Sequence, residues 1–167
     1  MEVFEPLQHL RVDFWAYAAS YKFYVEAATI ALLCYIGYTD LRTFKIRNET
    51  LVLLLVLYAL YAVLMRSAED ILFDVLFGAV IFGFLLFPYA RKLIGGGDVK
   101  FFAVACVWAG THCALIFSGA LLVFIVLHLA ALRMRWIAPL ESGGRHLIPY
   151  GPSVAGALIS VILLGYI

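Results

Sequence analysis

The chain has 167 residues, of which 65% are hydrophobic and 14% are charged, and its formal net charge is +1. Soluble domains are about half apolar and about one quarter charged, so this composition indicates a protein that lies in a lipid bilayer. A nearly neutral chain without a basic stripe is not typical of nucleic-acid-binding proteins.

Residues 1–22 carry an amphipathic pattern. Apolar residues recur at spacings of three and four from Leu7 to Tyr21, and charged residues lie off this stripe. The pattern predicts a helix lying on the membrane surface, with a poorly ordered tail as the alternative. We therefore expect an N-terminal surface segment, residues 1–22, followed by a membrane domain, residues 23–167.

Six apolar runs follow. A bilayer core requires roughly 20 helical residues, and backbone polar groups in lipid have to be satisfied within the protein. The fifth run is long enough by itself and the third nearly so, whereas the others need flanking residues and the fourth is the shortest. The runs are 23–39, 50–65, 71–89, 99–110, 112–132 and 152–167. The sequence predicts an all-α, polytopic membrane protein with six transmembrane helices, preceded by an amphipathic N-terminal helix.

Lysine and arginine are distributed unevenly between the two ends of these runs. Nine of the twelve lie around the connections 40–49, 90–98 and 133–149. They are Arg42, Lys45, Arg47, Arg91, Lys92, Lys100, Arg133, Arg135 and Arg145. The positive-inside rule predicts that these connections face the cytoplasm and that both termini lie outside. We expect a multi-pass protein of the cell inner membrane.

Two aspartates lie at the predicted cytoplasmic ends of helices. Asp40 ends the first helix and Asp98 begins the fourth, so the two carboxylates are expected at a similar depth. An ionisable residue at membrane depth is a functional-site candidate. Two facing carboxylates can share a proton, so that one activates water while the other protonates a scissile carbonyl, as in aspartyl proteases. The alternative is a pair of interfacial residues that bind Arg42 and Lys100.

Three glycines, Gly95, Gly96 and Gly97, precede Asp98 in the stretch "IGGGDVKFF". Glycine allows a substrate backbone to approach closely and leaves N–H groups accessible to a peptide strand. A dinucleotide-binding motif would need glycine at Lys100, and a Walker motif is missing. The glycines therefore favour a loop that shapes a peptide site.

Other candidate site residues lie near the same end of the helices. Lys100 is expected to anchor the peptide or to favour the charged form of Asp98. The alternative is that its side chain only extends to the lipid headgroups. Pro149, Tyr150 and Gly151 wall the cavity, or only mark the start of the last helix. The cysteines form no CxxC pair, and we expect neither a metal ion nor a cofactor.

Three ionisable residues lie within apolar runs away from this pair. At 1.5 Å per residue, His128 is about 7 Å from the cytoplasmic end of its helix. We expect it either to form a hydrogen bond across helices near the two aspartates or to be a packing histidine with one interhelical partner. Asp74 and Glu26 are expected at the membrane interface.

Four stretches keep the order of motifs in one known family. "TDLRTFKIRNETL" resembles its first aspartate motif, with Arg47 replacing the usual proline, and "GGGDVK" resembles its G-x-G-D motif. "KFFAVACVWAG" resembles the helix that follows, and "IPYGPSVAGALI" resembles the segment before the last helix. Over roughly residues 25–167 the chain thus resembles type IV prepilin peptidases, which are membrane aspartyl proteases.

The resemblance implies an aspartic endopeptidase with Asp40 and Asp98 as its catalytic residues. The implied substrate is a prepilin with a short basic leader ending in glycine, followed by a hydrophobic helix and cleaved at the cytoplasmic membrane face. Paired CxxC motifs of longer members are not seen, so the chain resembles the short, peptidase-only form of Flp (tight-adherence) pilus systems.

Two other functions remain open at this point. A proton- or cation-coupled transporter would use Asp40 and Asp98 as carriers, although the GGGD element is not repeated in the other half of the chain. A non-enzymatic membrane subunit of a secretion assembly would need neither carboxylate. If a co-expressed pilin were cleaved, and if this cleavage required both aspartates, both alternatives would be excluded.

Overall fold

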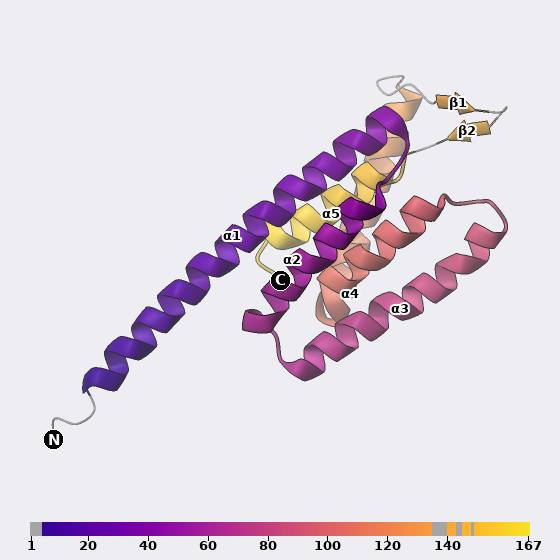
Figure 1. Cartoon of the computed structure of the whole chain (residues 1–167). Coiled ribbons are helices and arrows are strands. Elements are labelled where there is room, and N and C mark those ends of the chain that lie inside the picture. Colours follow the sequence, from indigo (N-terminus) through magenta and orange to yellow (C-terminus); the bar gives the residue numbers. More distant parts are fainter. Residues whose placement is uncertain (1–4, 135–139, 143–144, 148) are drawn as a thin grey trace.

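The computed structural model describes residues 5–134, 140–142, 145–147 and 149–167 (Figure 1). These residues form five helices and one short hairpin. The helices are α1 (Glu5–Thr43), α2 (Asn48–Met65), α3 (Ala68–Ala90), α4 (Gly96–Arg133) and α5 (Gly151–Leu163). Three of them, α2, α3 and α4, are long and apolar enough to cross a membrane. The predicted helical class is therefore confirmed, and the apolar helices are consistent with the predicted membrane protein.

A small hairpin interrupts the helical architecture before α5. Strands β1 (Leu140–Ser142) and β2 (Arg145–Leu147) pair antiparallel, with Leu140 opposite Leu147 and Ser142 opposite Arg145. Nothing in the sequence pattern predicts this hairpin. It projects from the end of the bundle at which α1 ends (Figure 1).

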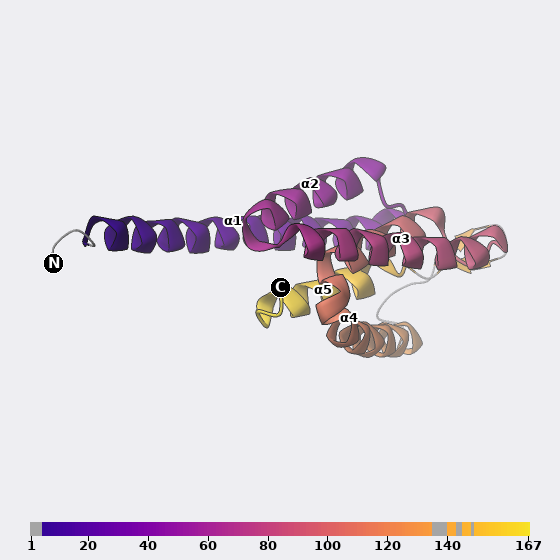
Figure 2. The ribbon, with the colours of Figure 1, turned by 90° about the horizontal axis from the view of Figure 1, so that it is seen from below.

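Helix α1 is a single helix of 39 residues that extends beyond the other helices at its N-terminal end (Figures 1 and 2). It passes without a break through residues 22 and 23, where the predicted surface segment meets the membrane domain. Lys22 Nζ donates to the Ile167 carbonyl oxygen at 2.6 Å and lies 3.4 Å from Glu26 Oε1. The surface position of residues 1–22 stays a prediction.

Helix α4 bends sharply at Gly110, where φ is 64° and ψ is 178°. Figure 2 shows its later part lying at a steep angle to its earlier part. The two parts pack together, since the rings of Phe102 and Phe117 are 6.0 Å apart between centroids. The predicted apolar runs 99–110 and 112–132 correspond to these two parts of α4.

The first part of α4 forms the centre of the bundle and packs against α3 and α5. Trp108 is fully buried there, and its Nε1 donates to the Leu54 carbonyl oxygen of α2 at 2.9 Å. The rings of Tyr58 and Tyr61 pack on Trp108 at centroid distances of 5.7 and 5.6 Å. Gly78 of α3 approaches α4 so closely that an added Cβ would lie 3.0 Å from the Ala103 carbonyl oxygen. Small residues at helix contacts are typical of packing in membranes.

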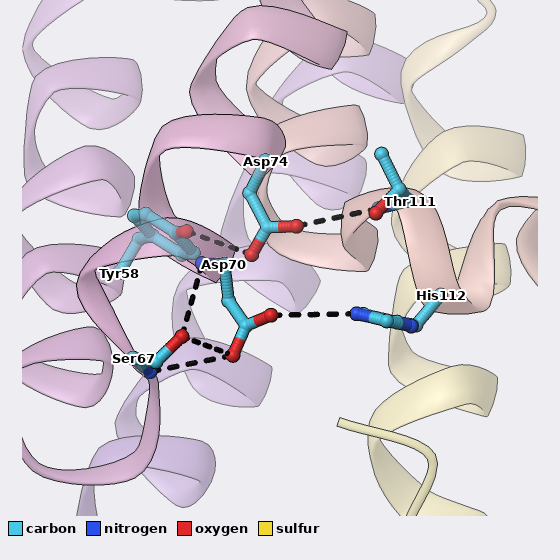
Figure 3. Close-up of polar contacts among 6 residues, drawn as sticks. All are labelled: Tyr58, Ser67, Asp70, Asp74, Thr111 and His112. Carbon is cyan, nitrogen blue, oxygen red and sulfur yellow. Dashed lines mark hydrogen bonds and ion pairs between the residues drawn. The ribbon is translucent and has the colours of Figure 1, made fainter.

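The bend in α4 is stabilised by a buried carboxylate. A helix that restarts after a bend leaves its first N–H groups unpaired, and in an apolar medium they need acceptors. The Thr111 N–H donates to Asp74 Oδ1 at 3.3 Å, and the Tyr58 hydroxyl donates to Asp74 Oδ2 at 3.0 Å (Figure 3). The sequence pattern predicts Asp74 at the membrane interface, but the structure buries it completely between α2, α3 and α4.

The adjoining residues fix the start of α3 beside the same bend. The Ser67 hydroxyl accepts from the Asp70 N–H at 3.1 Å, and the Asp70 carboxylate in turn accepts from the Ser67 N–H at 3.3 Å (Figure 3). This reciprocal capping box gives acceptors to two backbone N–H groups at the start of α3, those of Ser67 and Asp70. Asp70 also lies 3.5 Å from His112 Nε2. The start of α3 is thereby joined to α4 just after Gly110.

We predict that Gly110→Ala destabilises the protein by at least about 1–2 kcal/mol, the cost of a left-handed conformation for a residue with a Cβ. The added Cβ would also overlap Asp74 Oδ1. Thermal unfolding of the purified protein in detergent measures the effect. Gly119→Ala, with nothing within 4 Å of its added Cβ, is the matched control. Equal unfolding temperatures for the two variants would contradict the prediction.

Candidate active site

The structure brings Asp40 and Asp98 to one cavity, although they lie 58 positions apart in the chain. Asp40 belongs to the last turn of α1 and Asp98 to the first turn of α4. The rest of the cavity is lined by residues 44–47, which connect α1 to α2, by the first two residues of α2, and by Gly95, Gly96 and Gly97. Its volume is about 480 Å³. We call it the polar cavity.

Asp40 is buried, with 3% of its surface exposed, and is held by the start of α5. The Gly151 N–H, which α5 cannot satisfy within itself, donates to Asp40 Oδ2 at 2.9 Å. A Cβ at position 151 would lie 2.6 Å from the same oxygen, so only glycine permits this approach. Gly151 therefore positions the Asp40 carboxylate, whereas its predicted role of walling the cavity stays a prediction.

Asp98 is half-buried and lies close to the residue that begins α4. The N–H of its neighbour Val99 donates to the Gly95 carbonyl oxygen at 3.2 Å and closes the first turn. A Cβ at Gly95 would lie 2.9 Å from Asp98 Oδ2. Glycine at this position therefore leaves room for the carboxylate to face back over the start of its own helix.

The other two glycines contact neighbouring segments. A Cβ at Gly96 would lie 3.1 Å from the Tyr89 ring, and one at Gly97 would lie 3.3 Å from Ile46 Cβ. Packing within the chain thus accounts for small residues at both positions. Their predicted contact with a substrate strand stays a prediction.

The connection from α1 to α2 also shapes the cavity, although sequence reasoning did not identify it. Phe44 ends α1 with a φ of 52°, and its N–H donates to the Asp40 carbonyl oxygen at 2.9 Å. A left-handed residue at this position turns the chain out of the helix, so that residues 45–49 fold beside Asp40. Glycine is the usual residue in such a turn, and Phe44 carries no sequence signal for it.

Neither aspartate is neutralised by the basic residue suggested as its partner. Lys100 Nζ donates to Asn48 Oδ1 at 3.1 Å and links α4 to the start of α2. The Arg42 guanidinium lies 5.4 Å from the centre of the Tyr38 ring. Among the described residues, the ion pairs involve neither Asp40 nor Asp98. The structure therefore does not pair these aspartates with Arg42 and Lys100.

Tyr150 and Gly151, at the start of α5, each lie near one of the two aspartates. Pro149 is buried and Tyr150 is 39% exposed. Tyr150 lines a second cavity that also touches Asp98, while Gly151 holds Asp40. His128 borders neither cavity, and in the part of the chain that the structure describes its Nε2 has no hydrogen-bond partner.

The basic connections meet at this end of the bundle. The polar cavity joins the α1–α2 connection to the α3–α4 connection, and Gly151 adds the start of α5. Contacts at the opposite end involve Lys22 with Ile167 and Asp70 with His112. Lys45 and Arg47 of the α1–α2 connection line the polar cavity beside the two aspartates.

Comparison with known protein families identifies the family of the chain. The sequence model of the type IV leader peptidase family matches residues 27–134, a range that includes Asp40 and Asp98. The chain belongs to this family. Neither a curated protein nor a solved structure matches it.

Membership of the type IV leader peptidase family confirms the resemblance seen in the sequence motifs. It implies an aspartic peptidase with a prepilin substrate. The long apolar helices agree with a membrane protein. Gly151 lies outside the matched range, so its contact with Asp40 is a feature of the structure alone.

We predict that Gly151→Ala lowers peptidase activity by about 100-fold, the effect of moving a reacting group by about 1 Å. The new Cβ would push the Asp40 carboxylate out of place. Cleavage of a purified prepilin measures the loss, and membrane extraction checks insertion. Gly83→Ala, which meets nothing within 4 Å, should behave like the parent. Parent-like activity in Gly151→Ala would refute the positioning role.

Proposed function

We propose that the protein is an intramembrane aspartyl endopeptidase that removes the short basic leader of a Flp-like type IV prepilin. Asp40 and Asp98 are its catalytic residues, and cleavage takes place at the cytoplasmic face of the cell inner membrane. The single observation that carries the proposal is that both aspartates line one cavity. Family membership supplies the reaction class.

The cavity has features that suit hydrolysis of a peptide bond. One aspartate is buried against a backbone N–H and the other is half-buried, so the carboxylates have different surroundings. The polar cavity beside Asp98, about 480 Å³ in volume, has room for a segment of extended backbone. These features support a pair of carboxylates acting on a peptide.

In the proposed reaction the two carboxyl groups hold one proton between them. The ionised carboxylate accepts a proton from water, whose oxygen attacks the scissile carbonyl carbon. The protonated carboxyl group gives its proton to the carbonyl oxygen, which forms a gem-diol. The carboxyl group that took the proton from water then passes it to the amide nitrogen, while the other carboxylate takes a proton from a gem-diol hydroxyl; the C–N bond breaks, and the leader and the mature pilin are released with one proton again on the pair. Since one group must be protonated and the other ionised, the rate should depend on pH in a bell-shaped manner.

The proposed topology has six membrane spans. They are the part of α1 from residue 23, then α2, α3, the two parts of α4 on either side of Gly110, and α5. The excess of lysine and arginine in the connections 40–49, 90–98 and 133–149, two of which line the polar cavity, supports a cytoplasmic position for this end. Both termini would then lie outside.

We predict that Asp40→Asn and Asp98→Asn each reduce cleavage by at least about 100-fold, because an amide cannot accept and return the proton. The double variant should be no worse than either single variant, since the two groups act as one unit. Cleavage of a purified prepilin in liposomes, followed by N-terminal sequencing of the product, measures this.

Asp70→Asn serves as the matched control, because Asp70 lies at the opposite end of the bundle beside His112. It should cleave like the parent. Substantial activity in Asp40→Asn would refute the two-carboxylate mechanism. Absence of cleavage by the parent, together with aspartate-dependent proton or cation flux, would favour a transporter.

We also predict that a reporter fused after Ile167 reads as outside the cytoplasm. The nine lysines and arginines in and around the connections 40–49, 90–98 and 133–149 favour retention of these connections in the cytoplasm. A reporter pair that is active on opposite sides of the membrane measures the orientation. A cytoplasmic signal would refute the six-span topology.

A further inference from the structure

A groove with apolar walls lies between α2, α3 and the first part of α4. Its volume is about 340 Å³. The apolar residues that line it are Leu51, Val52, Leu55, Phe82, Ala103 and Val104. Val52 and Leu55 are 59% and 41% exposed, so the groove is open to the outside of the bundle along α2. We call it the lateral groove.

The lateral groove exists because α2 and α3 diverge. The two helices are joined by residues 66 and 67, and they move apart from that turn (Figures 1 and 2). The first part of α4 packs against both and forms the floor of the groove, where Ala103 and Val104 are buried. The small side chain of Ala103 leaves space between the diverging helices unfilled.

The end of the groove nearest to the polar cavity carries a positive charge. Lys100 and Asn48 line this end, and Lys100 Nζ donates to Asn48 Oδ1 at 3.1 Å. An ammonium group has three N–H donors and a side-chain amide has two, so further donors remain for the oxygens of an anion. Glu49, the acid next to Asn48, pairs with Arg47 at 3.1 Å. Among the described residues, the ion pairs do not include Lys100.

We propose that the lateral groove binds an anionic phospholipid, with its phosphate on Lys100 and Asn48 and one acyl chain between α2 and α3. Asn48 lines both the lateral groove and the polar cavity. The bound phosphate would therefore join the starts of α2 and α4 beside the two aspartates. The inference concerns a lipid and does not depend on the proposed peptidase activity.

The distribution of charge along the groove matches such a lipid. A lysine near a membrane surface lays its aliphatic stem on apolar residues and extends its ammonium group to the headgroups. Basic pockets between membrane helices on the cytoplasmic side bind anionic headgroups. Leu55 lies seven positions after Asn48, so at 1.5 Å per residue the apolar walls continue for about 10 Å from the charged end. This is the order of groups in a phospholipid, with the anion first and the acyl chain behind it.

The size of the groove favours an acyl chain over a substrate helix. One turn of a helix with its side chains is about 10–12 Å across and 5.4 Å long, which corresponds to roughly 500 Å³. The lateral groove has only about 340 Å³. A helix could therefore cover the groove but could not fill it, whereas a linear acyl chain can enter. A cavity of about 150 Å³ with apolar walls already holds a benzene molecule.

The headgroup, rather than the acyl chain, should decide which lipid binds. Lipid tails surround the bundle in any bilayer, so apolar walls alone give no preference for one lipid. One basic residue near the membrane surface attracts an anionic lipid by about 1 kcal/mol, which is about a fivefold preference. Lys100 therefore predicts selection of anionic over zwitterionic phospholipids.

The first test measures lipid binding to the purified, delipidated protein by native mass spectrometry. The ligands are dioleoylphosphatidylglycerol, dioleoylphosphatidylcholine and glycerol 3-phosphate. We expect phosphatidylglycerol to bind at least about fivefold more tightly than phosphatidylcholine. Glycerol 3-phosphate, which has no acyl chain, should bind more weakly than either lipid. Equal binding of the two lipids would overturn the inference, and so would binding of glycerol 3-phosphate as tight as that of phosphatidylglycerol.

Variants locate the site. Lys100→Gln should lower phosphatidylglycerol binding about fivefold, to the level of phosphatidylcholine, and leave phosphatidylcholine binding unchanged, which shows that the variant is folded. Lys92→Gln, in an exposed residue outside the groove, is the matched control and should keep the preference. Leu55→Trp fills the groove and should weaken binding of both lipids, whereas Val56→Trp, at a 48% exposed position outside the groove, should not. A preference that survives Lys100→Gln, or disappears equally in Lys92→Gln, would overturn the inference.

Photocrosslinking identifies the occupant of the groove in a bilayer. Benzoylphenylalanine replaces Val52, at the rim of the groove, or Val56 as the control, and the protein is placed in vesicles of equal parts phosphatidylglycerol and phosphatidylcholine. We expect crosslinks at position 52 to be enriched in phosphatidylglycerol, and those at position 56 to follow the vesicle composition. Equal composition at both positions would overturn the inference. If an added prepilin replaces lipid in the crosslinks at position 52, the groove is a substrate surface and the inference fails.

Discussion

Backbone N–H groups that a helix leaves unpaired at its start organise this bundle. In an apolar medium such donors have to find acceptors inside the protein. Asp74 accepts from Thr111 where α4 restarts after Gly110, and Asp40 accepts from Gly151 where α5 begins. The first contact stabilises the bend in α4, and the second holds a carboxylate at the polar cavity. Both depend on a glycine next to the aspartate, because an added Cβ would collide with the carboxylate.

The bend in α4 links the fold to the proposed chemistry. Because the helix turns at Gly110, its later part returns beside its earlier part, as the contact between Phe102 and Phe117 shows. Leu121 and Ile125 therefore reach a cavity that Asp98 also lines. The polar cavity and this second cavity, whose walls are mostly apolar, therefore meet at the Asp98 carboxylate.

Several features of the site could be predicted from sequence because they follow from local chemistry. Asp40 and Asp98 are identified by their positions at the ends of apolar runs, where an ionisable group needs a reason to be present. The order of the motifs is enough to indicate the family, which the match over residues 27–134 confirms. Other features escape this reasoning: the anchoring of Asp40 by Gly151, the left-handed Phe44 and the burial of Asp74 each depend on a neighbour from a distant segment.

The sequence by itself indicated a helical membrane protein with separate apolar runs at 99–110 and 112–132, and it indicated the type IV leader peptidase family. Composition, hydrophobic run length and motif order carry this information, since each is a property of residues close together in the chain. Only the tertiary structure decided which groups meet. The packing of α1, α4 and α5 puts both aspartates at one cavity. Arg42 and Lys100 contact Tyr38 and Asn48 instead of the aspartates. Such contacts depend on how helices pack, and packing is set by the shape of whole helix surfaces rather than by the spacing of residues in one segment.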